Sequence, residues 1–300
     1  MKQLLILSGK GGTGKTTIAG AFIKLSGVKA YADCDVDAPN LHLVAGQNSE
    51  PEKTVFYGLQ KASIDPEACV ECDRCRQYCR FDAIFTDTGY KVDHFACEGC
   101  GVCQAVCPAD AIAMNPAAAG DLMLYRGGEK VFSTARLRMG SGNSGLLVTE
   151  VKKLMKNSAA PETTLAIIDG SPGIGCPVIA SLSGTDMALI VAEPSVSGIS
   201  DMERIIKTAA IFGVTTVVCI NKYDTNMENT KKIELFCKNK GLCFAGRIPF
   251  DPEAVKAVNN GLSIVDVECG SGTAVKKVYE RVIEIMDREV SQKERERLFE

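Results

Sequence analysis

Residues 2–17 read KQLLILSGKGGTGKTT, an apolar run that passes directly into a glycine-rich loop. Residues 2–8 predict a short buried strand, and residues 18–25 have the apolar spacing of a helix. A strand, a glycine-rich loop and a helix in this order are the setting of a phosphate-binding loop. The glycines let backbone N–H groups point at phosphate oxygens, and the helix N-terminus adds partial positive charge. We therefore expect this segment to bind the phosphates of a nucleotide.

The loop residues have separate expected tasks. Lys15 is expected to bridge the β- and γ-phosphates of ATP, and the Thr16 hydroxyl to bind Mg²⁺. The expected ATP-binding residues of the loop are Gly9, Lys10, Gly11, Gly12, Thr13, Gly14, Lys15, Thr16 and Thr17. The same residues satisfy G-x-G-x-x-G, with Asp33 at a plausible ribose distance, so a dinucleotide site stays open as an alternative. That alternative explains neither Lys15 nor the carboxylates described below.

Two cysteine runs, CVECDRCRQYC at 69–79 and CEGCGVCQAVCP at 97–108, indicate a second kind of site. Thiolates at i, i+3 and i+6 wrap one corner of an iron–sulfur cube, and the fourth cysteine reaches the neighbouring cluster. The expected ligands are Cys69, Cys72, Cys75 and Cys107 for cluster 1, and Cys97, Cys100, Cys103 and Cys79 for cluster 2. Zinc held by four sulfurs in two pairs is the alternative, and a disulfide framework is not expected in a long chain without an export signal.

The segment from Cys69 to Cys107 resembles a bacterial two-cluster ferredoxin. It departs from that pattern at Arg80, where such a motif usually carries Pro, and this bears on loop geometry and cluster potential more than on ligation. We expect residues 60–118 to be a ferredoxin-like insertion with two [4Fe–4S] clusters. The rest, 1–59 and 119–300, is expected to be one discontinuous ATPase domain.

A second lysine in the loop, Lys10, resembles the deviant phosphate-binding loop of the MinD, ParA and nitrogenase iron protein superfamily. Residues 33–40, DCDVDAPN, resemble the switch I of that family. Residues 165–169, LAIID, followed by 170–175, GSPGIG, resemble its Walker B strand and switch II. Residues 217–222 end a strand where the family places an adenine-binding Asn, and residues 247–252 resemble the loop that covers the base.

The resemblance implies roles for named residues. Asp169 would bind Mg²⁺ with Thr16, Asp33 would lie near the metal, and Asp35 would orient the attacking water. Lys10 would reach across a dimer interface to the partner's nucleotide. The expected catalytic residues are Lys10, Lys15, Asp35 and Asp169, and the expected base-binding residues are Asn221, Pro249, Phe250 and Asp251. A solvated acidic loop is the plainer interpretation of residues 33–37. Asp35 and Asp169, however, follow predicted parallel strands, at the edge where such sheets bind ligands.

The remaining pattern alternates strands with helices, which predicts an α/β fold with a mainly parallel, doubly wound sheet. The expected strands are 2–8, 28–33, 164–169, 186–192, 214–220 and 242–248, and residues 121–125 begin a hairpin. The expected helices are 15–26, 144–157, 176–184, 197–212, 226–240, 251–260 and 272–289. The chain of 300 residues, 46% of them hydrophobic, is long enough to bury one large core and a small satellite.

The sequence shows no signal peptide and no apolar stretch of membrane-spanning length, so we expect a cytoplasmic protein. Its net charge of −3 favours no nucleic-acid partner. Residues 287–300 mix both charge signs around Leu298 and Phe299, which indicates a solvated tail and no membrane anchor.

Three functions fit these patterns. One is an ATPase whose nucleotide state is coupled to electron transfer through its clusters, acting as a homodimer or with a paralogue and passing electrons to a redox partner. The second is an iron–sulfur carrier with a cluster-accepting partner, although no Cys-x-x-Cys occurs outside the two cysteine runs. The third is a MinD-type positioning ATPase with structural clusters.

Six cysteines lie outside the two runs. Cys176 is either a cluster-binding or partner-facing thiol, or, as we favour, a packed residue at the start of a helix. The others are expected to be core residues: Cys34, Cys219, Cys237, Cys243 and Cys269.

Overall fold

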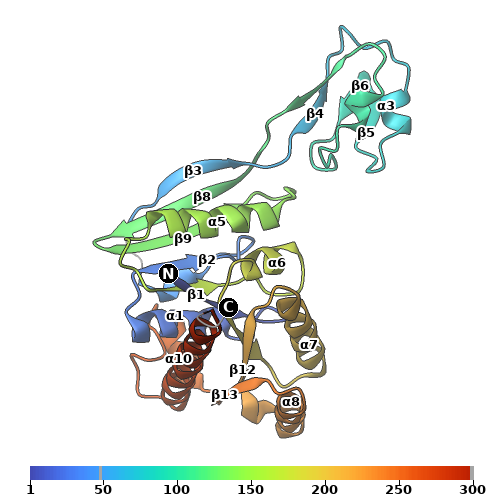
Figure 1. Cartoon of the computed structure of the whole chain (residues 1–300). Coiled ribbons are helices and arrows are strands. Elements are labelled where there is room, and N and C mark those ends of the chain that lie inside the picture. Colours follow the sequence, from blue (N-terminus) through green and yellow to red (C-terminus); the bar gives the residue numbers. More distant parts are fainter. Residues whose placement is uncertain (47–48, 298–300) are drawn as a thin grey trace.

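The computed structural model describes residues 1–46 and 49–297, with side chains described through residue 289. Its main sheet has nine strands in the order β13-β12-β11-β1-β10-β2-β9-β8-β3 (Figure 1). Their bounds are β1 Lys2–Leu7, β2 Ala30–Asp33, β3 Glu52–Tyr57, β8 Ala118–Gly127, β9 Lys130–Leu137, β10 Leu165–Asp169, β11 Met187–Ala192, β12 Thr215–Asn221 and β13 Cys243–Ile248. The strands from β13 to β9 pair in parallel, and β8 and β3 add an antiparallel edge.

Helices cover both faces of this sheet, because successive side chains of each strand point to opposite faces. Leu5 and Leu7 of β1 belong to one core, which includes side chains of α5, α6, α7 and α8, whereas Leu4 and Ile6 belong to a second core with α1 and α10. The helices are α1 Lys15–Ser26, α2 Leu41–Val44, α5 Ser144–Ser158, α6 Cys176–Leu182, α7 Val196–Ile211, η1 Tyr223–Thr225, α8 Met227–Asn239, α9 Pro252–Asn259 and α10 Gly270–Arg297. The expected α/β fold with a mostly parallel, doubly covered sheet is confirmed.

The predicted main-domain strands and helices are confirmed with bounds that differ by at most two residues, except for α10, which continues to Arg297. Strand β3 was not predicted. Its residues EKTVFY are nearly all exposed, so this edge strand lacks the alternation of apolar and polar residues that marks a half-buried one. The expectation for Leu298 and Phe299 lies outside the described residues.

The segment between β3 and β8 forms a separate lobe that stands away from the sheet at the end of an extended two-stranded arm (Figure 1). We call residues 61–115 the cysteine lobe. It contains β4 Lys61–Ile64, α3 Arg74–Gln77, β5 Ile84–Asp87, β6 Gly89–Val92, α4 Val102–Ala105 and β7 Ile112–Asn115. Strand β4 pairs with β7 and β5 with β6, both antiparallel. The lobe has a small apolar core of its own around Ala62, Ile84 and Ile112.

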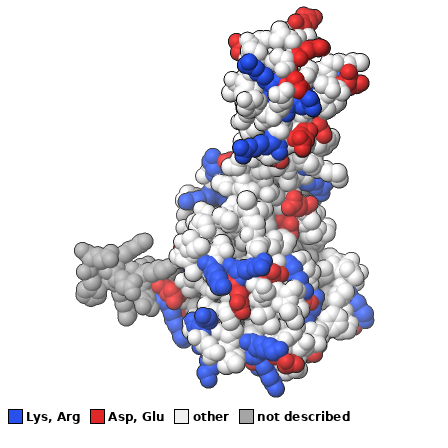
Figure 2. Space-filling model, turned by 90° about the vertical axis from the view of Figure 1, so that its right-hand side faces the viewer, with Lys and Arg blue, Asp and Glu red and all other residues white. Residues whose placement is uncertain are grey.

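In the described part of the chain, no helix is both long and apolar enough to cross a membrane. The face seen in Figure 2 carries basic and acidic side chains interspersed over both the lobe and the sheet domain. That face therefore has no large field of one charge sign.

A buried lysine ties α5 to the end of α6. The Lys152 ammonium donates to the carbonyl oxygens of Ser181 and Ser183, each at 2.6 Å, and to Thr185 Oγ1 at 3.2 Å. Burial lowers the pKa of Lys152 to about 8. Lys152 thus satisfies carbonyl oxygens at the C-terminal end of α6, where the Ser181 carbonyl also accepts from the Thr185 hydroxyl at 2.8 Å.

We expect Lys152→Met to lower the free energy of unfolding by about 3 kcal/mol, because it leaves buried carbonyl oxygens unsatisfied. Lys153→Met is the matched control, since Lys153 is the exposed neighbour on α5, paired with Glu150 at the surface. The control should change stability by less than about 0.5 kcal/mol. Equal effects of the two substitutions in urea unfolding would show that the bonds to α6 contribute nothing specific.

Candidate functional site

The glycine-rich loop leaves the carboxyl end of β1 and leads into α1. Gly14 has φ +88° and lies against Asn221, because a Cβ at this position would stand 2.3 Å from the Asn221 amide nitrogen. That amide donates to the Thr13 carbonyl at 2.7 Å. Asn221 ends β12, so two strand ends together fix the shape of the loop.

Lys15 lies at the centre of a buried charge cluster. Its ammonium is 2.6 Å from Asp169 Oδ1 and 3.9 Å from Asp35 Oδ2. The Thr16 hydroxyl donates to Asp169 Oδ2 at 2.7 Å. Burial acts against the Lys15 charge, but the Asp169 carboxylate outweighs it and raises the pKa of Lys15 above its ordinary value. Lys15 is therefore positively charged, and in this structure it neutralises the carboxylate expected to bind Mg²⁺.

Asp33 holds the segment after β2 in place. One of its carboxylate oxygens accepts from the Asp35 N–H, and the other accepts from the N–H groups of Asn40 and Leu41, all at 2.9 Å. Complete burial and the nearby Asp169 charge raise the pKa of Asp33 to about 7 despite these bonds. Both oxygens are thus engaged by the backbone here, and a position beside the metal stays a prediction.

Asp35 differs from Asp33 in its exposure. Its side chain is 18% exposed and faces Lys15 from the rim of the cluster. Burial raises the pKa of Asp35, and the Lys15 charge opposes that shift. The structure thus brings Lys15, Thr16, Asp35 and Asp169 together at the carboxyl edge of β1, β2 and β10, as the sequence predicted for the nucleotide site.

Lys10 does not point into this cluster. Its ammonium is 2.7 Å from Glu193 Oε2 and donates to Ser195 Oγ at 3.2 Å. Lys222 approaches the same Glu193 at 3.9 Å and donates to the Gly12 carbonyl at 2.8 Å. The sequence reasoning missed both Glu193 and Lys222. Each follows the carboxyl end of a parallel strand, β11 or β12, and that position was the available signal.

A cavity that opens to solvent lies beside the phosphate-binding loop. It is lined by Gly12, Gly14, Thr17, Ile18, Asn221, Lys222, Ile248, Pro249, Phe250, Asp251, Ala254, Val255, Val258, Asn259, Ile264 and Ser271. The segment that carries Phe250 is held by Asp224, which accepts the Phe250 N–H at 2.8 Å. Asp251 caps α9 and accepts the Ser271 N–H at 3.1 Å. All the residues predicted to bind a base therefore line one cavity next to the loop.

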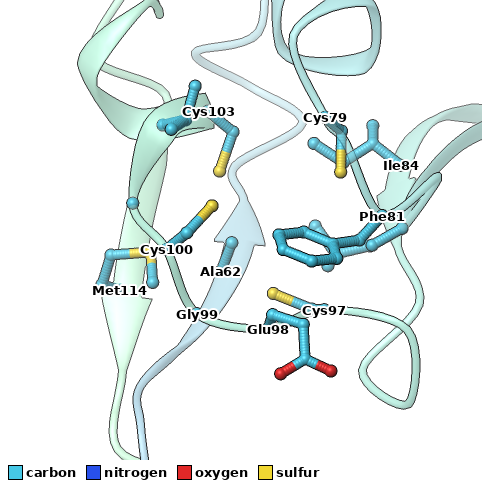
Figure 3. A pocket seen from close by; sticks show the side chains of 14 residues that line it. Ala62, Cys79, Phe81, Ile84, Cys97, Glu98, Gly99, Cys100, Cys103 and Met114 are labelled. Carbon is cyan, nitrogen blue, oxygen red and sulfur yellow. The ribbon is translucent and has the colours of Figure 1, made fainter.

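The two cysteine sets line two separate cavities in the cysteine lobe. Cys79, Cys97, Cys100 and Cys103 line one of them. Figure 3 shows these four sulfurs around the cavity, with Phe81 beside them and the Glu98 carboxylate directed away. The other cavity is lined by Cys69, Cys72, Cys75 and Cys107. Each set thus contains three cysteines of one run and the fourth of the other, the crossed pattern that the spacing predicted.

These cavities differ from a mononuclear metal site. Among the described residues, no three His, Cys, Asp or Glu side chains stand close enough to share one metal ion. Four thiolates around a cube of iron and sulfide each bind a different iron, so they stand farther apart than the ligands of one ion. Apolar neighbours such as Ile64 and Ile112 in one cavity, and Ala62 and Ile84 in the other, complete the walls.

The other cysteines divide by exposure. Cys34, Cys219 and Cys237 are buried, Cys243 and Cys269 are half-buried, and Cys176 is exposed. Our expectation of a packed Cys176 is wrong. It is the first residue of α6, whose buried side is formed by later residues such as Val178 and Leu182, so the Cys176 side chain stays outside the core.

Comparison with known proteins adds the following findings. Residues 4–264 match the model of the CobQ/CobB/MinD/ParA nucleotide binding domain. An uncharacterized protein of Methanocaldococcus jannaschii is 32% identical over 95% of this chain and 97% of its own. An iron-sulfur cluster carrier protein of that organism is 24% identical over 94% of this chain and 84% of its own. The septum site-determining protein MinD of Pyrococcus horikoshii OT3, complexed with Mg-ADP, has a TM-score of 0.57 at 18% identity, over 94% and 95% of the two chains. That last likeness shows the fold.

We expect Lys15→Ala to abolish or severely weaken MgATP binding, because it removes the cation that clamps the β- and γ-phosphates. Lys24→Ala is the control, since Lys24 lies on the same helix but pairs with Asp266 at the surface. Calorimetric titration with MgATP measures both. Unchanged affinity of the Lys15 variant, with the control also unchanged, would place the phosphates elsewhere.

Proposed function

Because this chain belongs to the CobQ/CobB/MinD/ParA nucleotide-binding family, we propose that it is an MgATP-hydrolysing protein whose nucleotide state controls electron transfer through two [4Fe–4S] clusters. The observation that carries this proposal is the pair of four-cysteine cavities in a lobe attached to the nucleotide-binding sheet. The donor set suits this group, because iron–sulfur clusters are held by cysteine thiolates. The clusters would supply one-electron carriers in the lobe.

Hydrolysis in this proposal begins with an exchange of partners at Lys15. The Lys15 ammonium leaves the Asp169 carboxylate, 2.6 Å away here, and binds the β- and γ-phosphates. Asp169 and Thr16 are then free to hold Mg²⁺, with Asp33 beside them; the ion would neutralise phosphate charge. Asp35 orients a water whose oxygen attacks the γ-phosphorus, while the bond from that phosphorus to the β–γ bridging oxygen breaks. The products are ADP and inorganic phosphate.

Lys10 has a different proposed role. In this structure the Lys10 ammonium is held by Glu193 and Ser195 of its own chain. We propose that ATP binding and dimer formation, with an identical chain or a paralogue, release it to contact the nucleotide of the partner subunit. Before the dimer forms, Glu193 acts as a positioning residue that holds the Lys10 ammonium in an ion pair within its own chain.

A second candidate is an iron–sulfur cluster carrier. The relative named as an iron-sulfur cluster carrier protein favours it. A carrier would pass a cluster to an apo-protein acceptor, so mixing with a clusterless ferredoxin separates the two functions. Loss of iron from this chain to the acceptor supports the carrier, and retention of all iron excludes it. A positioning ATPase, suggested by the fold likeness to MinD, would keep its clusters regardless of nucleotide.

We expect anaerobically prepared protein to contain about eight iron and eight acid-labile sulfide per chain. The EPR spectrum or the reduction potential of the reduced protein should change when MgATP is added, and should not change in Lys15→Ala, the control that lacks the phosphate clamp. Two zinc ions per chain without sulfide would refute the clusters. Full iron content with no nucleotide effect would refute the coupling and leave structural clusters.

We expect Asp35→Ala to bind MgATP yet stop hydrolysis, because the attacking water loses its orienting carboxylate. Trapped in the ATP state, this variant should sediment as a dimer with MgATP, and adding Lys10→Ala should return it to a monomer. Glu228→Ala is a control, since Glu228 pairs with Lys232 on the surface of α8. An Asp35 variant that is saturated with ATP and remains monomeric contradicts the cross-dimer role of Lys10.

A further inference from the structure

The segment that runs from the end of β9 into the first two residues of α5 contacts both the cysteine lobe and the start of α6. We call residues 138–145, RMGSGNSG, the bridging loop. Its start is fixed to the sheet, because the Arg138 N–H donates to the Ala119 carbonyl at 2.9 Å. Figure 1 shows the end of α5 that carries this loop below the cysteine lobe. The loop is therefore placed between the two parts of the chain that the proposed function couples.

On the lobe side, the loop lies against Phe95 and Glu98, which stand on either side of a predicted cluster ligand, Cys97. A Cβ on Gly140, which has φ +71°, would stand 2.5 Å from Cδ1 of Phe95. A Cβ on Gly142 would stand 3.6 Å from the Glu98 carboxylate. Glu98 and Cys97 both line the cavity drawn in Figure 3, and the Glu98 carboxylate points away from the sulfurs. Gly140 thus lets the loop lie against the Phe95 ring, and Gly142 lies within contact distance of Glu98 at the wall of this cavity.

On the other side, the loop reaches the segment that follows Asp169. A Cβ on Gly145 would stand 3.3 Å from the carbonyl oxygen of Cys176, the first residue of α6. The segment before it, residues 170–175, is bound to the phosphate-binding loop, because the Gly173 N–H donates to the Ser8 carbonyl at 3.0 Å. The far end of α6 is held to α5 by Lys152. Helix α6 is thus contacted at both of its ends by α5, so we expect a displacement of one helix to move the other.

We propose that the bridging loop transmits the nucleotide state to the cavity lined by Cys79, Cys97, Cys100 and Cys103. This inference rests on the proposed function and names the route of its coupling. A shift of residues 170–175 around the γ-phosphate moves α6 and the start of α5 together, and the loop then displaces the Phe95–Glu98 segment, whose Cys97 and Glu98 line the cavity. Solvent exposure and nearby charge set the potential of an iron–sulfur cluster. The cavity of Cys69, Cys72, Cys75 and Cys107 is lined by neither Phe95 nor Glu98. We therefore expect the potential of cluster 2, which Cys97 would bind, to respond more strongly to nucleotide.

The test removes the Phe95 ring that lies against Gly140, and it leaves the nucleotide site and the cysteine ligands unchanged. Phe95→Ala should keep the iron content, the MgATP affinity and the hydrolysis rate, because the Phe95 side chain is 73% exposed and lies outside the nucleotide site. It should reduce the MgATP-induced change in the EPR-monitored potential of cluster 2 about threefold or more. Phe85→Ala is the matched control, an exposed phenylalanine on β5 of the same lobe. It should retain the full change.

The outcomes separate this inference from the proposed function. A nucleotide effect that persists in Phe95→Ala overturns the route and leaves the coupling in place. No effect in the natural protein overturns both. If Phe95→Ala loses iron, Gly140→Ala approaches the same contact from the loop side, and amide hydrogen exchange is the readout. MgATP should change exchange at residues 93–99 in the natural protein but not in Gly140→Ala; an equal change in both proteins overturns the route.

Discussion

The ion pair between Lys15 and Asp169 is the constraint on which the arrangement of the site depends. Charges taken out of water cost several kcal/mol each unless they are paired, so these two side chains have to meet. Ile6 of β1 lies in register with Asp169 of β10, and Asp169 lies in register with Asp33 of β2. Three neighbouring parallel strands thus bring the cation and the acids to one edge. The Lys15 charge that Asp169 neutralises here is also the one that a phosphate has to capture, so folding and the proposed binding use the same side chain.

Much of the main domain could be predicted from the sequence because its strands are buried on both faces. A short, wholly apolar run such as residues 187–192 is typical of a buried parallel strand when it stands between two helical stretches, and all six residues are buried. The acids at strand ends followed from the same logic, since parallel strands share a carboxyl edge. Strand β3 escaped prediction because its residues are exposed, and Glu193 because a single acid after a strand belongs to no motif. The prediction that Cys176 is packed was wrong, because the position of a residue in the chain does not show which side of a short helix is buried.

The cysteine lobe shows where spacing is informative and where it is not. The two runs were enough to predict which four cysteines share a cavity, because the first three thiols of each run are too close in sequence to separate, whereas the fourth stands apart and joins the other set. They could not predict that Phe95 and Glu98 lie against Gly140 and Gly142, since that contact depends on the direction in which the arm leaves the sheet. Glycines in a loop are common, and only the structure shows that these two have neighbours where a side chain would be.

The arm has a consequence for how such a chain can be assembled. Its two strands leave and rejoin the sheet side by side, for the Gly58 N–H donates to the Ala117 carbonyl at 3.1 Å. A short turn could join the strands there, and the sheet, its two cores and the nucleotide site would all lie outside the removed segment. Gain or loss of the lobe is therefore a local change in the gene, confined to a hairpin at the sheet edge. Both cores of the sheet would keep all their residues in a chain without the lobe.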